Sequence, residues 1–126
     1  MIEALADYLS QQGYNNIYCD FMPDEQTRPD CIGLYCWSHT VAELNDGSGI
    51  FFVQVQVRRS SYDEAKTVCK ELFALLDSGL EENQIWLSEK QWCIARPRRG
   101  PVLLDRTAKT TTFYCEIALW GENQEV

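Results

Sequence analysis

The sequence predicts an α+β domain in which a mainly antiparallel, mixed β-sheet carries two principal helices packed on one face. Three observations predict this class. The patterns along the chain run helix, strands, helix, strands. Residues 51–57 alternate apolar and polar side chains, which is typical of a half-buried strand. Residues 62–76 repeat apolar side chains at helical spacing, which is typical of a helix packed on its own sheet.

Length and composition are those of a single domain over residues 1–126. With 126 residues, 45% of them hydrophobic, the chain can bury a core of its own. No apolar run approaches the ~18 residues that a membrane-crossing helix needs. The first residues are acidic where a signal peptide would carry lysines. We therefore expect synthesis in the cytoplasm, no export and no membrane partner.

The first third of the chain combines a helix with two strands. Helical spacing of apolar residues predicts a helix over residues 2–9, and Gly13 is placed to end it. Residues 15–23 predict a short strand, and residues 24–30 a polar loop. Residues 31–37 are rich in strand-forming side chains and predict the next strand.

A hairpin and the second helix follow. The segment NDGSG, residues 45–49, is a strong turn signal and predicts that the next strand pairs antiparallel with residues 31–37. In that next strand Phe51, Val53, Val55 and Val57 share one face, and Phe52, Gln54, Gln56 and Arg58 share the other. Ser61 and Glu64 have the spacing of a capping box, so we expect the helix to begin there and to end at Gly79.

The last third of the chain reads as strands. They are expected over residues 84–87, 91–97, 101–106 and 110–121. Between the second and third of these, RPRRGP (residues 96–101) predicts a stiff basic turn, because two prolines fix φ and a glycine allows a bend.

The residues with reactive side chains form no recognisable catalytic or metal-binding motif. His39 is the one histidine, so a metal site would depend on cysteines, and Cys31 and Cys36 lie at an odd spacing that points them to opposite faces of a strand. No phosphate-cradling loop is present. Free, mostly buried thiols are expected in a cytoplasmic chain. We predict no catalytic residue, no metal and no cofactor.

The charge of the chain is uneven. A net charge of −8 argues against duplex nucleic acid as a direct partner. Residues 1–30 hold six acidic side chains against one arginine, whereas residues 96–109 hold five basic side chains against one aspartate. Two interpretations stand: a head-to-tail contact between identical copies, or two separately solvated faces.

Two segments carry a resemblance to a known family. RPDCIGLY (residues 28–35) and VQVQVRRSSYDEAKTVCKELFALLD (residues 53–77) resemble the minor capsid and tail-terminator-type proteins of tailed bacteriophages. Those chains are similar in length. They have an amino-terminal amphipathic helix, a Val/Gln/Arg strand and a helix opened by Tyr-x-x-Ala. The resemblance covers about the first two thirds of the chain, and residues 53–59 and 62–65 match the strand-helix motif.

The resemblance implies a virion structural protein and no enzyme. Such a protein forms a ring, commonly a hexamer, at the head-proximal end of the phage tail, where its partners are its own copies, the tail tube protein and the head-side connector. Catalytic residues are not carried over. A head-tail neck completion protein, a small cytosolic module for single-stranded nucleic acid that stacks bases on Trp92 and Tyr114, and an enzyme with a reactive cysteine are the alternatives.

The predicted interface uses the polar face of the central strand and the basic segment that follows the second helix. Its residues are Gln54, Gln56, Arg58, Arg59, Arg96, Arg98 and Arg99. Amides and guanidinium groups can form hydrogen bonds with a neighbouring copy without burying much apolar surface. The acidic residues 1–30 are the expected counter-surface.

Overall fold

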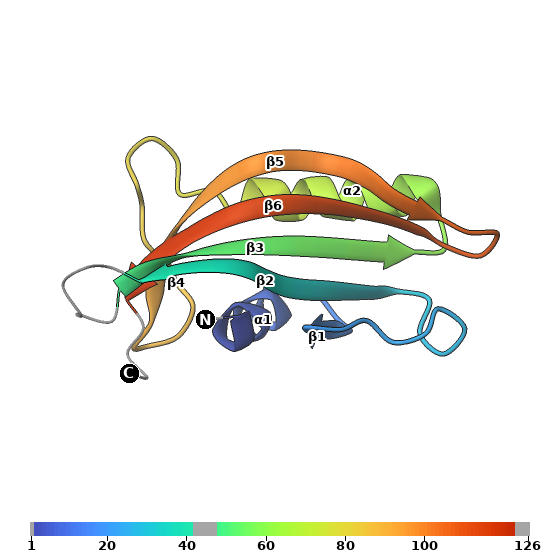
Figure 1. Ribbon diagram of the computed structural model, residues 1–126, viewed down its shortest axis with the longest axis horizontal. Coiled ribbons are helices and arrows are strands. Elements are labelled where there is room, and N and C mark those ends of the chain that lie inside the picture. Colours follow the sequence, from blue (N-terminus) through green and yellow to red (C-terminus); the bar gives the residue numbers. More distant parts are fainter. Residues whose placement is uncertain (1, 42–47, 123–126) are drawn as a thin grey trace.

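A computed structural model describes residues 2–41 and 48–122 and confirms the predicted α+β class (Figure 1). The elements, in chain order, are α1 (Ile2–Gln11), β1 (Ile17–Cys19), β2 (Cys31–Val41), β3 (Ser48–Arg59), α2 (Tyr62–Leu75), β4 (Ile85–Trp86), β5 (Trp92–Arg106) and β6 (Thr111–Glu122). Six strands form one curved sheet in the order β1-β2-β3-β6-β5-β4. β1 is parallel to β2, and the other neighbours are antiparallel.

Both helices pack on one face of this sheet, as predicted. Figure 1 shows α2 running along β5 and β6, and α1 lying beside β1 and β2. The apolar positions of the central strands point toward them: Val53, Val55 and Val57 are fully buried, and they share one core with Leu5 of α1 and Leu72 of α2. The period-two alternation of β3 therefore assigns one face of the sheet to the core and leaves the other face without a helix.

The end of α1 follows the sequence prediction. Gly13 adopts a φ of 98°, a left-handed conformation that costs a glycine nothing. The Gly13 N–H donates to the Ser10 carbonyl, and the Tyr14 N–H donates to the Leu9 carbonyl, both at 3.1 Å. These two hydrogen bonds satisfy carbonyl groups that the last turn would leave unpaired.

The second helix begins as predicted and ends earlier than predicted. The Ser61 hydroxyl oxygen accepts a hydrogen bond from the Glu64 N–H at 3.3 Å, so the helix has its expected N-cap. The helix ends at Leu75 rather than at Gly79. The chain leaves the helix because Ser78 pairs with the edge of β5, where its N–H donates to the Ala95 carbonyl at 2.8 Å. Gly79, with a φ of 76°, shapes the turn that follows.

The prediction of a turn at residues 96–101 is wrong. β5 runs unbroken from Trp92 to Arg106, with register shifts between Pro97 and Arg99, between Arg99 and Val102, and after Leu103. β4 pairs with β5 only at its first two residues, so most of β5 is an edge strand. An edge strand tolerates proline, which has no N–H to donate, and bulges absorb the irregular backbone.

The antiparallel pairing predicted for β2 and β3 is confirmed. It runs from Cys31 opposite Arg58 to Val41 opposite Gly49. The predicted turn at residues 45–49 lies mostly outside the described residues. A register shift at Trp37 interrupts the pairing, so β2 carries a bulge at this position.

Gly121 of β6 lies where a side chain does not fit. A Cβ atom at this position would be 2.4 Å from the backbone oxygen of Trp92. We expect Gly121→Ala to lower the free energy of unfolding by about 1–3 kcal/mol, because the rigid backbone of β5 must move. Urea unfolding followed by circular dichroism measures this. Gly100→Ala is the matched control, since its Cβ would meet only the Phe73 ring at 3.7 Å; equal losses in the two variants would contradict the prediction.

Candidate interaction surface

The face of the sheet opposite the two helices, here called the helix-free face, exposes large apolar side chains at one end. Trp37 is 54% exposed and Trp120 is 46% exposed. Trp37 stacks against Phe52 of β3 with ring centroids 5.3 Å apart. This end, called the aromatic patch below, consists of Trp37, Ile50, Phe52, Ala118 and Trp120, together with Ile94, which is buried. Its tryptophans are the side chains that dominate the energetics of protein interfaces.

An arginine from β5 covers part of this patch. The guanidinium of Arg98 lies over the Phe52 ring, 4.8 Å from its centroid. Because β6 lies between β5 and β3 in the sheet, Arg98 has to reach across β6 to make this contact. Arg98 and Trp37 thus both contact Phe52, which combines a cation–π contact with an aromatic stack.

A groove of about 420 Å³ opens beside the patch. The groove, called the Trp120 groove below, is lined by Ile50, Glu82, Ile94, Arg96, Ala118 and Trp120. Arg96 and Glu82 form an ion pair in its wall, and both side chains are about half exposed. Trp120 is held in turn by an edge-to-face contact with Trp92 at 6.5 Å. The groove therefore has an apolar floor and a charged border.

Glutamines cover the middle of the helix-free face. The Gln56 Nε2 donates to the Gln54 Oε1 at 2.7 Å, so the two predicted interface amides bond to each other along β3. Gln54 also lines a hollow of about 210 Å³ with Tyr35, Trp37 and Glu116. The unused donors and acceptors of these amides remain available to a partner.

Arg58 closes the other end of the helix-free face. Its guanidinium donates to the carbonyl oxygens of Arg28 at 2.7 Å, Pro29 at 3.3 Å and Pro23. Met22 from the same loop lies over Gly33 of β2, where a Cβ atom would come within 2.6 Å of its side chain. The loop between β1 and β2 therefore packs on the sheet, and the hydrogen bonds of Arg58 hold it there.

Arg59 also acts within the chain. Its Nη1 donates to the Cys31 carbonyl at 3.3 Å, and its Nε lies 3.6 Å from a carboxylate oxygen of Glu64 on α2. The Arg59 side chain is only 12% exposed. It joins β3 to β2 and to the first turn of α2, where an acidic residue is already favoured by the helix dipole.

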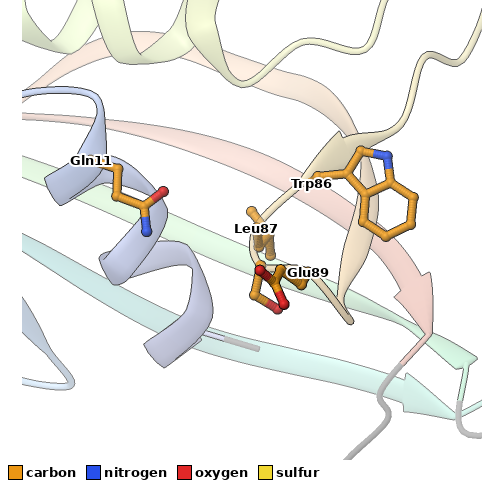
Figure 2. Close-up of a pocket in the computed structure, with 5 residues that line it drawn as sticks. Gln11, Trp86, Leu87 and Glu89 are labelled. Carbon is orange, nitrogen blue, oxygen red and sulfur yellow. The ribbon is translucent and has the colours of Figure 1, made fainter.

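A second groove lies on the helix side of the molecule, between the end of α1 and the turn after β4. It measures about 810 Å³ and is lined by Gln11, Trp86, Leu87, Ser88 and Glu89. Figure 2 shows Gln11 extending from α1 toward Leu87 and Glu89. Like Trp120, Trp86 is about half exposed. Unlike the Trp120 groove, this groove has no arginine among its described lining residues. Among the described side chains, no cysteine lines either groove.

The thiols for which a shift is resolved are held in the protonated form. Burial raises the pKa of Cys93 to about 12. A hydrogen bond with Cys69, and then burial, raise the pKa of Cys115. Burial also raises the pKa of Cys19 and of Cys31. These shifts disfavour the thiolate that a nucleophile or a metal ligand needs. All six cysteines are free, and the residues that the structure describes contain no group of three potential metal ligands.

No protein-family model and no curated protein matches this chain. Within the described part of the chain, no helix is long and apolar enough to cross a membrane.

The structure places the seven predicted interface residues in three environments. Gln54, Gln56 and Arg98 lie on the helix-free face, and Arg96 borders its groove. Arg99 is exposed on β5 opposite Glu116. Arg58 and Arg59 instead bind carbonyl groups of their own chain. Sequence reasoning missed the aromatic patch, although the alternation of β3 and β6 already placed Phe52 and Trp120 on the polar side.

Replacing Arg58 should release the loop between β1 and β2. We expect Arg58→Met to lower the free energy of unfolding by about 2 kcal/mol, because three backbone carbonyls lose a charged donor. Hydrogen exchange should rise in residues 22–30. The control is Arg99→Met, an exposed site on β5 where a change within about 0.5 kcal/mol is expected. If hydrogen exchange in residues 22–30 is the same in the Arg58 variant as in the wild type, Arg58 does not hold this loop on the sheet.

Glu25 ties the same loop to the β5–β6 turn. Hydrogen bonds from the hydroxyls of Thr110 at 2.6 Å and Thr107 at 2.9 Å hold the pKa of the Glu25 carboxyl below its usual value. A lowered pKa means that this contact is present above the ordinary value of 4.5 and is lost as the pH falls through the folded-state pKa. An NMR titration of Glu25 should show this, and the double variant Thr107→Val, Thr110→Val should bring the pKa back toward the ordinary value. An unchanged Glu25 pKa in the double variant would show that the two threonine hydroxyls do not lower it.

Proposed function

We propose that this chain is a virion structural protein of the minor capsid or tail-terminator type of tailed bacteriophages, and that it catalyses no reaction. In this proposal copies of the chain form a ring, commonly a hexamer, at the head-proximal end of the tail. The ring contacts the tail tube protein on one side and the head-side connector on the other. The same surfaces would serve a head-tail neck completion protein, which is the nearest alternative.

The observation that carries the proposal is the open helix-free face. Two tryptophans about half exposed, Trp37 and Trp120, lie on a rigid sheet beside Arg96 and Arg98. Exposed apolar patches bordered by polar groups mark interaction sites, and tryptophan and arginine are the residues most enriched at their energetic centres. The two-helix α+β architecture agrees with what the resemblance over residues 28–35 and 53–77 implies.

The arginines of β5 fit an assembly role. The chain as a whole carries a net charge of −8, so identical copies repel one another unless opposite charges meet at the contact. Arg98 and Arg99 provide positive charge on a surface of amide and aromatic side chains that also carries Glu116. Acidic surfaces that could meet them occur in residues 1–30 and in the loop after α2.

Single-stranded nucleic acid is the second candidate partner. The exposed rings of Trp37 and Trp120, together with Arg98, resemble the stacking platforms on which such proteins hold bases. Salt-sensitive binding of an oligonucleotide by a monomer would favour this reading over the assembly role.

Charge reversal on β5 tests the assembly role. We expect Arg98→Glu with Arg99→Glu to weaken association of the chain at moderate salt by about tenfold or more, because attraction to an acidic neighbour becomes repulsion. Sedimentation velocity measures the association, and negative-stain images show whether rings form. The matched control is Arg106→Glu with Lys109→Glu, which changes the net charge equally at the last residue of β5 and in the turn that follows it. Equal effects in both double variants, or a wild-type chain that stays monomeric at every concentration and never joins a tail, would contradict the proposal.

A further inference from the structure

Leu80 is the most exposed large apolar side chain among the described residues. It is 99% exposed at the tip of the loop between α2 and β4, residues 77–83, called the Leu80 loop below. Acidic side chains surround it along the chain: Asp77, Glu81 and Glu82. A leucine this exposed buries almost none of its surface against its own chain, so its whole side chain is accessible to a contact outside the chain.

The Leu80 loop is fixed by hydrogen bonds. The Ala95 N–H donates to the Ser78 hydroxyl at 2.7 Å, and the Ser78 N–H donates to the Ala95 carbonyl at 2.8 Å, so one end of the loop is bonded to β5. Asp77 accepts from the Gly79 N–H at 2.8 Å, and the Asn83 N–H donates to the Ser78 carbonyl at 3.0 Å. A loop held in this way presents Leu80 without a large loss of conformational entropy on binding.

The Trp120 groove matches the tip of this loop in chemistry. Its floor is apolar, from Ile50, Ile94 and Ala118, and Trp120 forms part of its lining. Arg96 lies in its wall, paired with Glu82 of the same chain, and Arg98 and Arg99 follow on β5. An aliphatic side chain flanked by carboxylates therefore fits an apolar groove that has two further arginines on the adjoining part of β5.

We propose that the occupant of the Trp120 groove is Leu80 of a second copy of this chain. The leucine side chain of the second copy covers Ala118 and Trp120 of the first, and Glu81 of the second copy approaches the arginines on β5 of the first. This inference rests on the proposed self-association and adds to it the segment that binds and the site that receives it.

The Leu80 loop and the Trp120 groove lie side by side on one molecule. Arg96 lines the Trp120 groove and also a hollow with Leu80, Pro97 and Phe73. Each copy can therefore give its Leu80 loop to one neighbour and receive the Leu80 loop of another. Rings are built from head-to-tail contacts of this kind.

Three variants test the contact. Leu80→Asp removes the apolar side chain of the Leu80 loop, and Ala118→Arg fills the Trp120 groove. Leu104→Ser is the matched control, since Leu104 is a leucine 45% exposed elsewhere on β5. We expect Leu80→Asp and Ala118→Arg each to weaken self-association by about tenfold or more in sedimentation equilibrium, and Leu104→Ser to leave it unchanged. Circular dichroism melting verifies that each variant is folded.

Mixing the variants is the decisive measurement. Neither variant can form the contact with its own copies. In an equimolar mixture, Leu80 of the Ala118→Arg variant can enter the intact groove of the Leu80→Asp variant. We expect the mixture to associate more strongly than either variant by itself. A mixture that stays monomeric, or a Leu80→Asp chain that associates like the wild type, overturns the inference and leaves self-association standing. A wild-type chain that is monomeric at every concentration overturns both this inference and the proposed function.

Discussion

The alternation of side chains along β3 and β6 is the constraint on which the rest of the molecule depends. These two strands lie at the centre of the sheet, and their inward positions, such as Val55 and Cys115, are fully buried. Both helices are needed to cover that face. Among the described residues, the opposite face is covered by the loop between β1 and β2 and by a few long side chains, and the rings of Trp37 and Trp120 stay about half exposed there.

The arginines show how position decides the role of one residue type. Arg58 and Arg59 lie at the end of β3, where carbonyls of the β1–β2 loop and of Cys31 come within reach of their guanidinium groups. A guanidinium has five donors and satisfies several carbonyls at once, so these two side chains serve the fold. Arg98 lies on an edge strand, with an aromatic ring as its contact, and keeps donors free for a partner.

Local pattern was enough to predict the fold class and most elements, because the alternation of β3 and the helical spacing of α2 are local properties. The continuous β5 was not predictable, since RPRRGP has the composition of a turn and is held in the strand by its irregular pairing with β6. The role of Arg58 was equally hidden, because Arg28 lies 30 positions away in sequence. The aromatic patch could be found only with the tertiary structure, in which Trp120 is 46% exposed and neither α1 nor α2 packs on its face of the sheet.

The patch and the Leu80 loop are ordered surfaces that a protein partner can contact, which is what the proposed assembly role requires. Burial raises the pKa of thiols such as Cys93, so these side chains contribute packing rather than charge. Binding needs apolar surface that is already ordered, and the sheet supplies it with Trp37 braced by Phe52 and Trp120 by Trp92. Little conformational entropy is lost when such rigid rings meet a partner. The chain carries a high net negative charge and positive charge on β5. Its affinity is therefore highest for a partner that brings both an apolar side chain and charges that complement the arginines of β5.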